Sequence, residues 1–414
     1  MIADCLVRGA RLLTPRDPAP RAGAAQGHLL DIPDAVVAAR DGRIVFAGPA
    51  AEAALVVTPA PDAVIVEAAG DTIVPGFVDA HTHVVYAGDR RAELRRRLAG
   101  ATRAEIAAAG GGILATVEAT RRADEDELCR QTWPRLDEML ACGTTTCEAK
   151  SGYGLETAAE LKMLRAIRHL DHDHAIDLVP TFLGAHEVPS EYRDRRRAYV
   201  ELVIDEMIPA VVEEQAADWC DVFCETGVFT PAEAEEILEA GRRAGLRPRI
   251  HADELDASGG ALVAAAVGAR SADHLVHVSP AGIEALAEAG VVATLLPAAA
   301  FYLKLPHYAP ARALIAAGVP VALGTDVNPG GGLSPSMPFA MTLACFAMGM
   351  TLEEALTAAT LNAAYALDRH EVVGSLEPGK VMDAVVVRGD VTELLRVGAG
   401  AIRMVIKRGR TVVG

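Results

Sequence analysis

Two histidines at the end of an apolar run are the residues of this chain that most directly suggest chemistry. His81 and His83 stand two positions apart, after the run Val74-Pro-Gly-Phe-Val-Asp-Ala. In a β-strand, side chains two residues apart point to the same face, so both imidazoles can reach one metal ion. A lone His-x-His motif is weak, and two unrelated polar residues in a turn explain it equally well.

Further residues that bind metals or move protons recur at the ends of later apolar runs. They are Glu148, Lys150, His186, His251, Glu254, His274 and Asp326. Each has an ordinary explanation when taken alone: a loop histidine, a buried histidine with a partner, or a turn aspartate before Asn-Pro-Gly. Their occurrence together, at one strand end after another, favours a single site.

The types of these residues predict a metal site of catalytic kind. His81, His83 and His251 supply nitrogen and Asp326 supplies oxygen, a set that suits Zn²⁺ or Fe²⁺/Fe³⁺. We expect one divalent ion per chain. Such an ion lowers the pKa of a bound water from 15.7 to about 7, so that hydroxide can attack a carbonyl carbon. Glu254 and His274 are the predicted proton-transfer residues.

The elements that must hold these residues alternate between short apolar runs and longer amphipathic stretches from Ile73 onward. This alternation predicts βα units and a parallel sheet. The strand candidates are residues 72–78, 143–148, 176–183, 221–225, 248–251, 271–274, 291–296 and 319–325. About eight strands are what a closed (β/α)₈ TIM-type barrel needs, and chemistry in that fold sits at the carboxyl ends of the strands. Residues 231–245 are expected to be a helix, with Thr230 as its N-cap.

Both ends of the chain have strand and turn character. Residues 35–48 predict a hairpin around Asp41-Gly42, and residues 378–387 and 404–413 predict a strand and a second hairpin. We therefore expect an α/β chain with a small β-sandwich domain from residues 1–73 and 371–414, and a barrel from residues 74–370. Residues 15–26 are rich in Pro, Ala and Arg and are expected to be a loop.

Composition limits the partners and the compartment. The net charge of −17, from 39 basic and 56 acidic residues, argues against a nucleic-acid partner, because phosphates select Lys and Arg. A small-molecule substrate sees only the field of its pocket. No long apolar run indicates a membrane span or a signal peptide, so no membrane partner is expected. Seven scattered cysteines, an odd number, favour reduced thiols in a cytoplasmic protein.

The chain resembles the amidohydrolase superfamily and, within it, the imidazolonepropionase family. The superfamily likeness rests on Pro75-Gly-Phe-Val-Asp-Ala-His-Thr-His83, a later strand-end histidine and Thr325-Asp326. The narrower likeness covers nearly the whole chain and rests chiefly on two blocks. These are Glu148-Ala-Lys-Ser-Gly-Tyr-Gly-Leu155 and Ile250-His-Ala-Asp-Glu254.

The resemblance implies a reaction: water opens the ring of 4-imidazolone-5-propanoate to give N-formimidoyl-L-glutamate, in histidine degradation. It also implies the metal ligands His81, His83, His251 and Asp326. The implied substrate-binding residues are Arg90, Tyr153, His186, Glu254, Asn328, Gly330 and Gly331. Arg90 would clamp the propanoate, since guanidinium meets a carboxylate with two parallel hydrogen bonds. At Gly331 the family pattern has Ser or Thr, so only a backbone contact is expected there.

In the implied mechanism, His274 or Glu254 takes the proton of the attacking water and Asp326 passes a proton to the leaving nitrogen. His186 is expected to contact the substrate and to polarise the carbonyl that is cleaved. Some superfamily members carry a carboxylated lysine between two metals, but for Lys150 we expect no such role. The family also makes a homodimer plausible.

Other functions compete with this interpretation. A related deaminase or cyclic amidase would keep the fold and act on another small heterocycle, for which the arginine clamp has no purpose. A non-catalytic scaffold would be expected to have lost metal ligands, and this chain keeps all four. A binding module for metal or imidazoles is distinguished from an enzyme by metal-dependent turnover.

Overall fold

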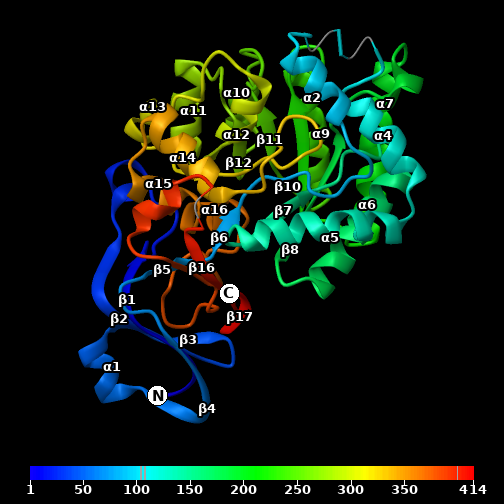
Figure 1. Cartoon of the computed structure of the whole chain (residues 1–414). Helices are drawn as coiled ribbons and strands as arrows, with labels where there is room; N and C mark the ends of the chain where they lie inside the picture. The colour runs from blue at the N-terminus through cyan, green and yellow to red at the C-terminus, as the bar shows by residue number, and fades with distance from the viewer. Residues whose placement is uncertain (103–104, 107–108, 399) are drawn as a thin grey trace.

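Parallel strands wrapped by helices form the larger part of the molecule, and a sheet made from both chain ends forms the rest (Figure 1). The computed structural model describes residues 1–102, 105–106, 109–398 and 400–414. In Figure 1 both termini lie in the smaller part, while most helices surround the larger part.

The larger part is a barrel of parallel strands. In sheet order, its strands are β14 (Val321–Leu323), β13 (Val292–Leu295), β12 (Ser271–His274), β11 (Ile250–Ala252), β9 (Trp219–Cys224), β8 (Asp177–Ala185), β7 (Thr144–Lys150) and β6 (Phe77–Asp79). A short piece, β10 (Arg247–Pro248), precedes β11 and pairs with β9. Every pairing in this sheet is parallel.

Backbone hydrogen bonds join the first and last strands and nearly close the barrel. The amide of Ala80 donates to Leu323, that of Asp326 to His81, and that of His83 to Val327. The Asp79 carboxylate also accepts the Thr325 amide, at 2.9 Å, and its hydroxyl, at 2.5 Å. These contacts confirm the predicted (β/α)₈ barrel and place the ends of β6 and β14 side by side.

The helices cover the outside of the barrel. On its first half they are α2 (Arg91–Leu98), α4 (Ile113–Arg122), α5 (Glu125–Ala141), α6 (Thr157–Asp173), α7 (Arg196–Leu202) and α8 (Ile208–Glu213). The second half carries α9 (Pro231–Arg243), α10 (Gly260–Ala266), α11 (Pro280–Ala289), α12 (Pro297–Leu303), α13 (Ala311–Ala316), α14 (Met337–Met348), α15 (Leu352–Ala358) and α16 (Leu361–Ala366). Helix α9 begins as expected, with a capping box between Thr230 and Glu233.

The small sheet contains strands from both chain ends. It runs in the order β17 (Arg410–Val413), β16 (Ile402–Lys407), β15 (Ala384–Val387), β5 (Thr72–Pro75), β1 (Ile2–Thr14), β2 (Leu30–Arg40) and β3 (Arg43–Pro49), with β4 (Thr58–Glu67) beside β1. Helix α1 (Ala50–Val56) follows β3. Apolar side chains from distant strands of the sheet, such as Ile44 and Ile406, share one core, so the sheet curls over itself. The small domain predicted from both ends is confirmed.

One expected strand is divided between the two sheets. Residues 72–78 were expected to be a single barrel strand, but β5 ends at Pro75 in the small sheet and β6 begins at Phe77 in the barrel. Gly76 separates them, and a Cβ there would lie 2.4 Å from the Thr145 hydroxyl. The chain can turn from one sheet to the other only because this residue has no side chain.

The expected loop at residues 15–26 is anchored to the barrel. It ends in a short 3₁₀ helix, Gly23–Gly27, whose Gln26 is fully buried. The Gln26 amide donates to the Val321 carbonyl and its oxygen accepts the Val321 amide, both at 3.1 Å. Asn362 accepts the Arg21 amide at 2.7 Å. The segment therefore bridges the small sheet and the last barrel strand.

Among the described residues, no helix has the length and apolar character needed to cross a membrane.

Candidate metal centre and substrate pocket

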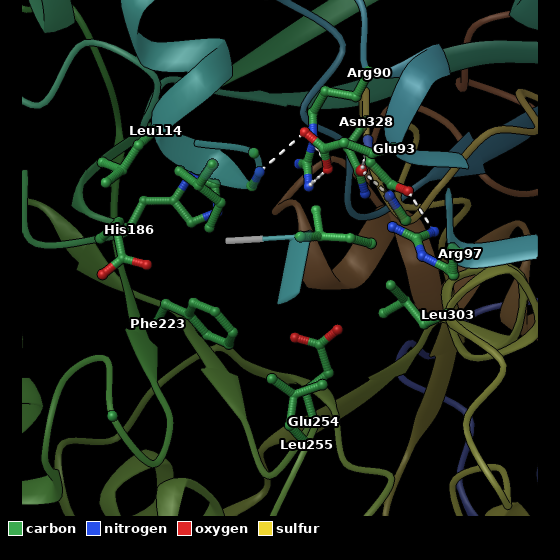
Figure 2. Close-up of a pocket in the computed structure, with 18 of the residues that line it drawn as sticks. Arg90, Glu93, Arg97, Leu114, His186, Phe223, Glu254, Leu255, Leu303 and Asn328 are labelled. Atoms are coloured by element: carbon green, nitrogen blue, oxygen red, sulfur yellow. Dashed lines mark hydrogen bonds and ion pairs between the residues drawn. The ribbon is translucent and has the colours of Figure 1, made fainter. Parts of the chain in front are cut away.

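A cavity of about 740 Å³ opens where the carboxyl ends of the barrel strands meet. Its walls contain His83, Arg90, Tyr153, His186, His251, Glu254, His274, Asp326, Asn328, Gly330 and Gly331. His81, the remaining residue of the expected site, is fully buried beside them. Figure 2 shows Glu254 pointing into this space from one side, His186 and Phe223 on a second side, and Arg90, Glu93 and Asn328 facing Glu254. The barrel thus brings together every residue of the expected site.

Three of the four expected metal ligands, His81, His83 and Asp326, have a spacing that fits one ion, and the fourth, His251, lies beside His83. The Asp326 Oδ1 atom lies 3.7 Å from His81 Nε2 and 3.6 Å from His83 Nε2. His83 Nε2 lies 3.2 Å from His251 Nε2. Ligand atoms at about 2.1 Å from a tetrahedral zinc lie about 3.4 Å from one another. His81, His83 and Asp326 also form a group whose ligand atoms all lie within 4.8 Å.

Carboxylates behind two of these histidines set which ring nitrogen faces the cavity. His81 Nδ1 lies 2.6 Å from Asp273, and His251 Nδ1 lies 3.1 Å from Asp221. Each Nδ1–H therefore donates backwards, and each Nε2 keeps its lone pair for a metal. His81 Nε2 is buried and has no hydrogen-bond partner in the described structure, as a metal ligand should be.

Burial also prepares the ligands electrostatically. It lowers the pKa of His81 and of His83 well below 6.5, with further lowering from neighbouring charged groups. Both rings are therefore neutral at pH 7 and can bind a metal. Burial raises the pKa of Asp326 to about 8, and the nearby Glu254 adds to this rise. A cation at the site would offset that penalty.

The two expected proton-transfer residues lie beside each other. His274, at the end of β12, has its Nδ1 3.8 Å from Glu254 Oε1. Its ring centroid lies 5.3 Å from those of both His81 and His251. Burial lowers the pKa of His274 to about 4, so the ring is neutral and able to accept a proton at pH 7. The pair is placed to move a proton next to the metal ligands.

His186 presents an acceptor to the cavity. Its Nδ1 lies 2.9 Å from the Gly152 carbonyl and must donate to it. Burial lowers the pKa of His186 to about 3, so the ring is neutral and Nε2 carries a lone pair. A neutral ring in this tautomer accepts an N–H from the substrate, as the expected contact requires. The expected polarising role would need a protonated Nε2 and stays a prediction.

Tyr153 lies in the same wall on a tightly held loop. Its ring centroid is 5.2 Å from that of His186 and 6.0 Å from that of His83. The buried Glu160 carboxylate accepts the amides of Gly152, Gly154 and Leu155 at 2.7–2.9 Å. The loop that carries Tyr153 is therefore fixed by a residue that lies outside the cavity wall.

Arg90 is oriented by an acid that the sequence argument missed. Its Nε and Nη2 lie 2.9 and 2.7 Å from Glu93, three residues later on α2. The guanidinium also lies against Gly330, where a Cβ would come within 2.3 Å of Nη1. The sequence could have indicated this contact, because Arg90 and Glu93 have the i, i+3 spacing of an ion pair on a helix.

The turn after Asp326 is held by hydrogen bonds between its own residues. Asn328 Oδ1 accepts the amides of Gly330 and Gly331 at 2.8 and 2.6 Å. Its Nδ2 donates to the Asp326 carbonyl at 2.7 Å. A substrate that uses these groups must replace bonds that the turn already makes.

Three charged residues of the barrel strands, Asp221, Asp273 and Arg249, were also missed as part of the site, and Glu148 was found as a strand-end candidate but given no role. Glu148, Asp221, Asp273 and Arg249 are fully buried, directly behind the metal ligands. The sequence contains one indication of them: each is a charged residue within an apolar strand, and burying a charge costs free energy unless the charge is paired. Sequence alone does not show which histidine each acid contacts.

Comparisons with known proteins agree with this geometry. The amidohydrolase family profile matches residues 72–412. The imidazolonepropionase of Symbiobacterium thermophilum is 49% identical over 413 residues, which cover 99% of this chain and 97% of the relative. That of Shouchella clausii is 52% identical over 350 residues, or 84% of this chain and 78% of the relative. The solved guanine deaminase of E. coli has the same fold, with a TM-score of 0.72, 17% identity and 99% coverage of both chains. The chain belongs to the amidohydrolase family and, within it, to the imidazolonepropionases.

Proposed function

We propose that this protein hydrolyses the ring of 4-imidazolone-5-propanoate to N-formimidoyl-L-glutamate in histidine degradation. The observation that carries the proposal is 49% identity to an imidazolonepropionase over 99% of the chain. The alternative of a deaminase or cyclic amidase is supported only by structures of low sequence identity, which share the fold.

The site takes a divalent metal, and we propose that it is a single Zn²⁺ or iron ion. His81, His83, His251 and Asp326 would hold it. When bound, such an ion supplies an activated water and polarises the carbonyl under attack. The ligand set of three nitrogens and one oxygen suits both metals.

Different cavity residues are proposed to bind different parts of the substrate. Arg90, fixed by Glu93, is the proposed clamp for the propanoate, and its guanidinium can meet both carboxylate oxygens. His186 accepts an N–H of the ring through Nε2, because its Nδ1 is engaged by Gly152. Tyr153 lies beside His186 and covers the same part of the cavity. With the propanoate at Arg90 and a ring N–H at His186, the ring carbonyl would face the metal ligands.

Ring opening requires one proton to leave the water and one to reach the ring nitrogen. The water oxygen bonds to the carbonyl carbon, and the bond from that carbon to the adjacent ring nitrogen breaks. The neutral His274 or the adjacent Glu254 takes the proton from the water. Asp326, whose ionised carboxylate lies among the ligands, takes the remaining proton of the added hydroxyl and passes it to the departing nitrogen. The product is a carboxylate and a formimidoyl amine.

The cellular setting is also part of the proposal. All seven cysteines are free in the structure, which suits a reducing compartment such as the cytoplasm. We further propose a homodimer and no nucleic-acid partner, the latter from the net charge of −17.

The proposal is tested by following the absorbance of 4-imidazolone-5-propanoate with purified protein. Zinc- or iron-loaded protein should consume the substrate and form N-formimidoyl-L-glutamate, identified by mass spectrometry. Chelation should stop the reaction, and readdition of metal should restore it. His251→Ala, which removes one ligand, should remain inactive after metal is added. If loaded wild-type protein leaves the substrate intact, the proposed function is wrong.

A further inference from the structure

Lys150, at the carboxyl end of β7, ends in the middle of a buried group of acids. Its side chain is fully buried, and its Nζ lies 2.7 Å from Glu148 and 2.6 Å from Asp221. A third acid, Asp273, lies 3.8 Å away. The proposed mechanism gives this lysine no part.

Two of these acids are the ones that orient the metal histidines. Asp221 lies between Lys150 and His251 Nδ1, and Asp273 lies between Lys150 and His81 Nδ1. Arg249 supports the acids from the other side, with Nε 3.1 Å from Glu148 and Nη2 3.4 Å from Asp273. Its position is fixed by hydrogen bonds to the Ala80 and Ala366 carbonyls, at 2.8 and 3.0 Å.

The same acids could attract a second cation. His81, Glu148 and Asp273 form a group whose ligand atoms all lie within 4.8 Å of one another. The ammonium of Lys150 and the guanidinium of Arg249 already contact both carboxylates of that group. A carbamate on Lys150 would place negative charge against Glu148 and Asp221, which lie within 2.7 Å of Nζ.

We propose that Lys150 is a positioning residue for a single metal ion. Its ammonium holds Asp221 and Asp273 so that His251 and His81 both present Nε2 to the cavity, and it occupies the space of a second cation. The inference deepens the proposed function, because the ion it serves is the one used in that reaction. It predicts that the lysine stays an unmodified amine.

A variant of Lys150 leaves buried acids without a partner and can lower stability for that reason alone. Lys407 provides a matched control. It is also buried, and its Nζ lies 2.6 Å from Asp383 and 2.7 Å from Asp177, at the junction with the small sheet. Lys407→Met therefore removes a comparable ion pair that does not contact the metal histidines.

The experiment measures zinc affinity by competition with a chromogenic chelator, and zinc content by elemental analysis. Wild type should bind one zinc per chain and show an unmodified mass in bicarbonate buffer. Lys150→Met should bind zinc about 10- to 100-fold more weakly, the usual effect of losing such a supporting contact. Lys407→Met should melt at a lower temperature and bind zinc as wild type does.

Three outcomes would overturn the inference: equal zinc affinity in Lys150→Met and Lys407→Met, two zinc ions per wild-type chain, or a carboxylated lysine. If Lys150→Met does not fold, Lys150→Arg replaces it, because it keeps the charge but cannot keep both distances. Unchanged zinc affinity in Lys150→Arg would then overturn the inference. Turnover of the imidazolone is not part of this measurement, so the proposed function stands or fails separately.

Discussion

At the level of single residues, the groups that contact the Nδ1 atoms of the histidines decide which ring nitrogen carries the proton. Asp273 and Asp221 fix the tautomers of His81 and His251, and the Gly152 carbonyl fixes that of His186. The motif residues could be found from sequence because they recur at strand ends. Their partners could not, because a single sequence does not show which buried acid faces which histidine. The polarising role expected for His186 likewise depends on a contact, that with the Gly152 carbonyl, which the sequence does not show.

Metal binding should release a proton from Asp326. Burial raises the pKa of its carboxyl to about 8, so the group is protonated at pH 7 and must ionise to ligate a cation. His81 and His83 add no proton, because their pKa values lie well below 6.5. Against the lowering effect of burial, the neighbouring Asp221 raises the pKa of His251, which adds to the release at lower pH. Proton release should therefore decline as the pH rises through about 8. Calorimetry of zinc binding in buffers of different ionisation enthalpy measures it.

Asp326→Asn is the control for this proton, since an amide cannot ionise. The variant should bind zinc more weakly and lose the part of the release that declines near pH 8. Equal proton release in the variant and the wild type would contradict the assignment to Asp326.

Arg90→Met should raise KM far more than it lowers kcat. A charge-assisted hydrogen bond contributes about 1.5–3 kcal/mol, so kcat/KM should fall by about 10- to 150-fold. Steady-state kinetics with 4-imidazolone-5-propanoate measures the change. The matched control is Arg91→Met, which removes a neighbouring arginine whose side chain is 87% exposed. A similar loss in both variants would refute the clamp.

At the scale of elements, the strands were easier to predict than their division between sheets. Seven of the eight strand candidates lie at barrel strands, because buried parallel strands have short apolar runs in the sequence. Residues 72–78 also form an apolar run, but they belong to two sheets. The reason is the contact between Gly76 and Thr145, which only the folded chain reveals.

Glu160 on α6 should matter to both stability and substrate binding. Its carboxylate accepts three backbone amides of the loop that carries Tyr153. Glu160→Ala leaves these buried amides unpaired and should cost about 3 kcal/mol or more of unfolding free energy, from about 1–3 kcal/mol for each group. Denaturant unfolding measures this loss. KM should also rise, because Tyr153 and His186 both depend on this loop.

Glu235→Ala on α9 is the comparison, since that glutamate is exposed on a helix far along the chain. It should change unfolding free energy by less than about 0.5 kcal/mol. A Glu160 variant as stable as this one, with an unchanged KM, would show that the loop does not need its carboxylate.

At the scale of the whole molecule, the charge of the chain opposes the charge of the proposed substrate. The net charge is −17, and the substrate carries a propanoate. The cavity wall contains cations that oppose this field, among them Arg193 and Lys304, together with the acids Glu187 and Glu254. Composition gives only the net charge of the chain, and the local field depends on where the chain places its arginines.

These cations should make substrate capture sensitive to salt. Raising ionic strength from about 0.01 M to about 0.1 M shortens the screening distance from about 30 Å to about 10 Å, and kcat/KM should fall about threefold. Arg193→Gln should have a lower kcat/KM at low salt and a shallower dependence, while its kcat stays unchanged. If kcat/KM instead rises with salt, repulsion of the anionic substrate by the net negative charge of the chain governs its binding, and the cations of the cavity wall do not.

The contacts of Lys407 tie the two chain ends to the catalytic part of the molecule. This residue of β16 bonds to Asp383 in the small sheet and to Asp177 and the Thr145 carbonyl in the barrel. Beside it, the amide of Gly76 donates to Asp383 immediately before β6, the strand that leads to His81 and His83. The two chain ends are therefore bonded to the barrel where its first strand begins, although no described residue of the small sheet lines the cavity. For this reason, the two chain ends and the barrel are expected to unfold in a single transition, which calorimetry of thermal unfolding measures.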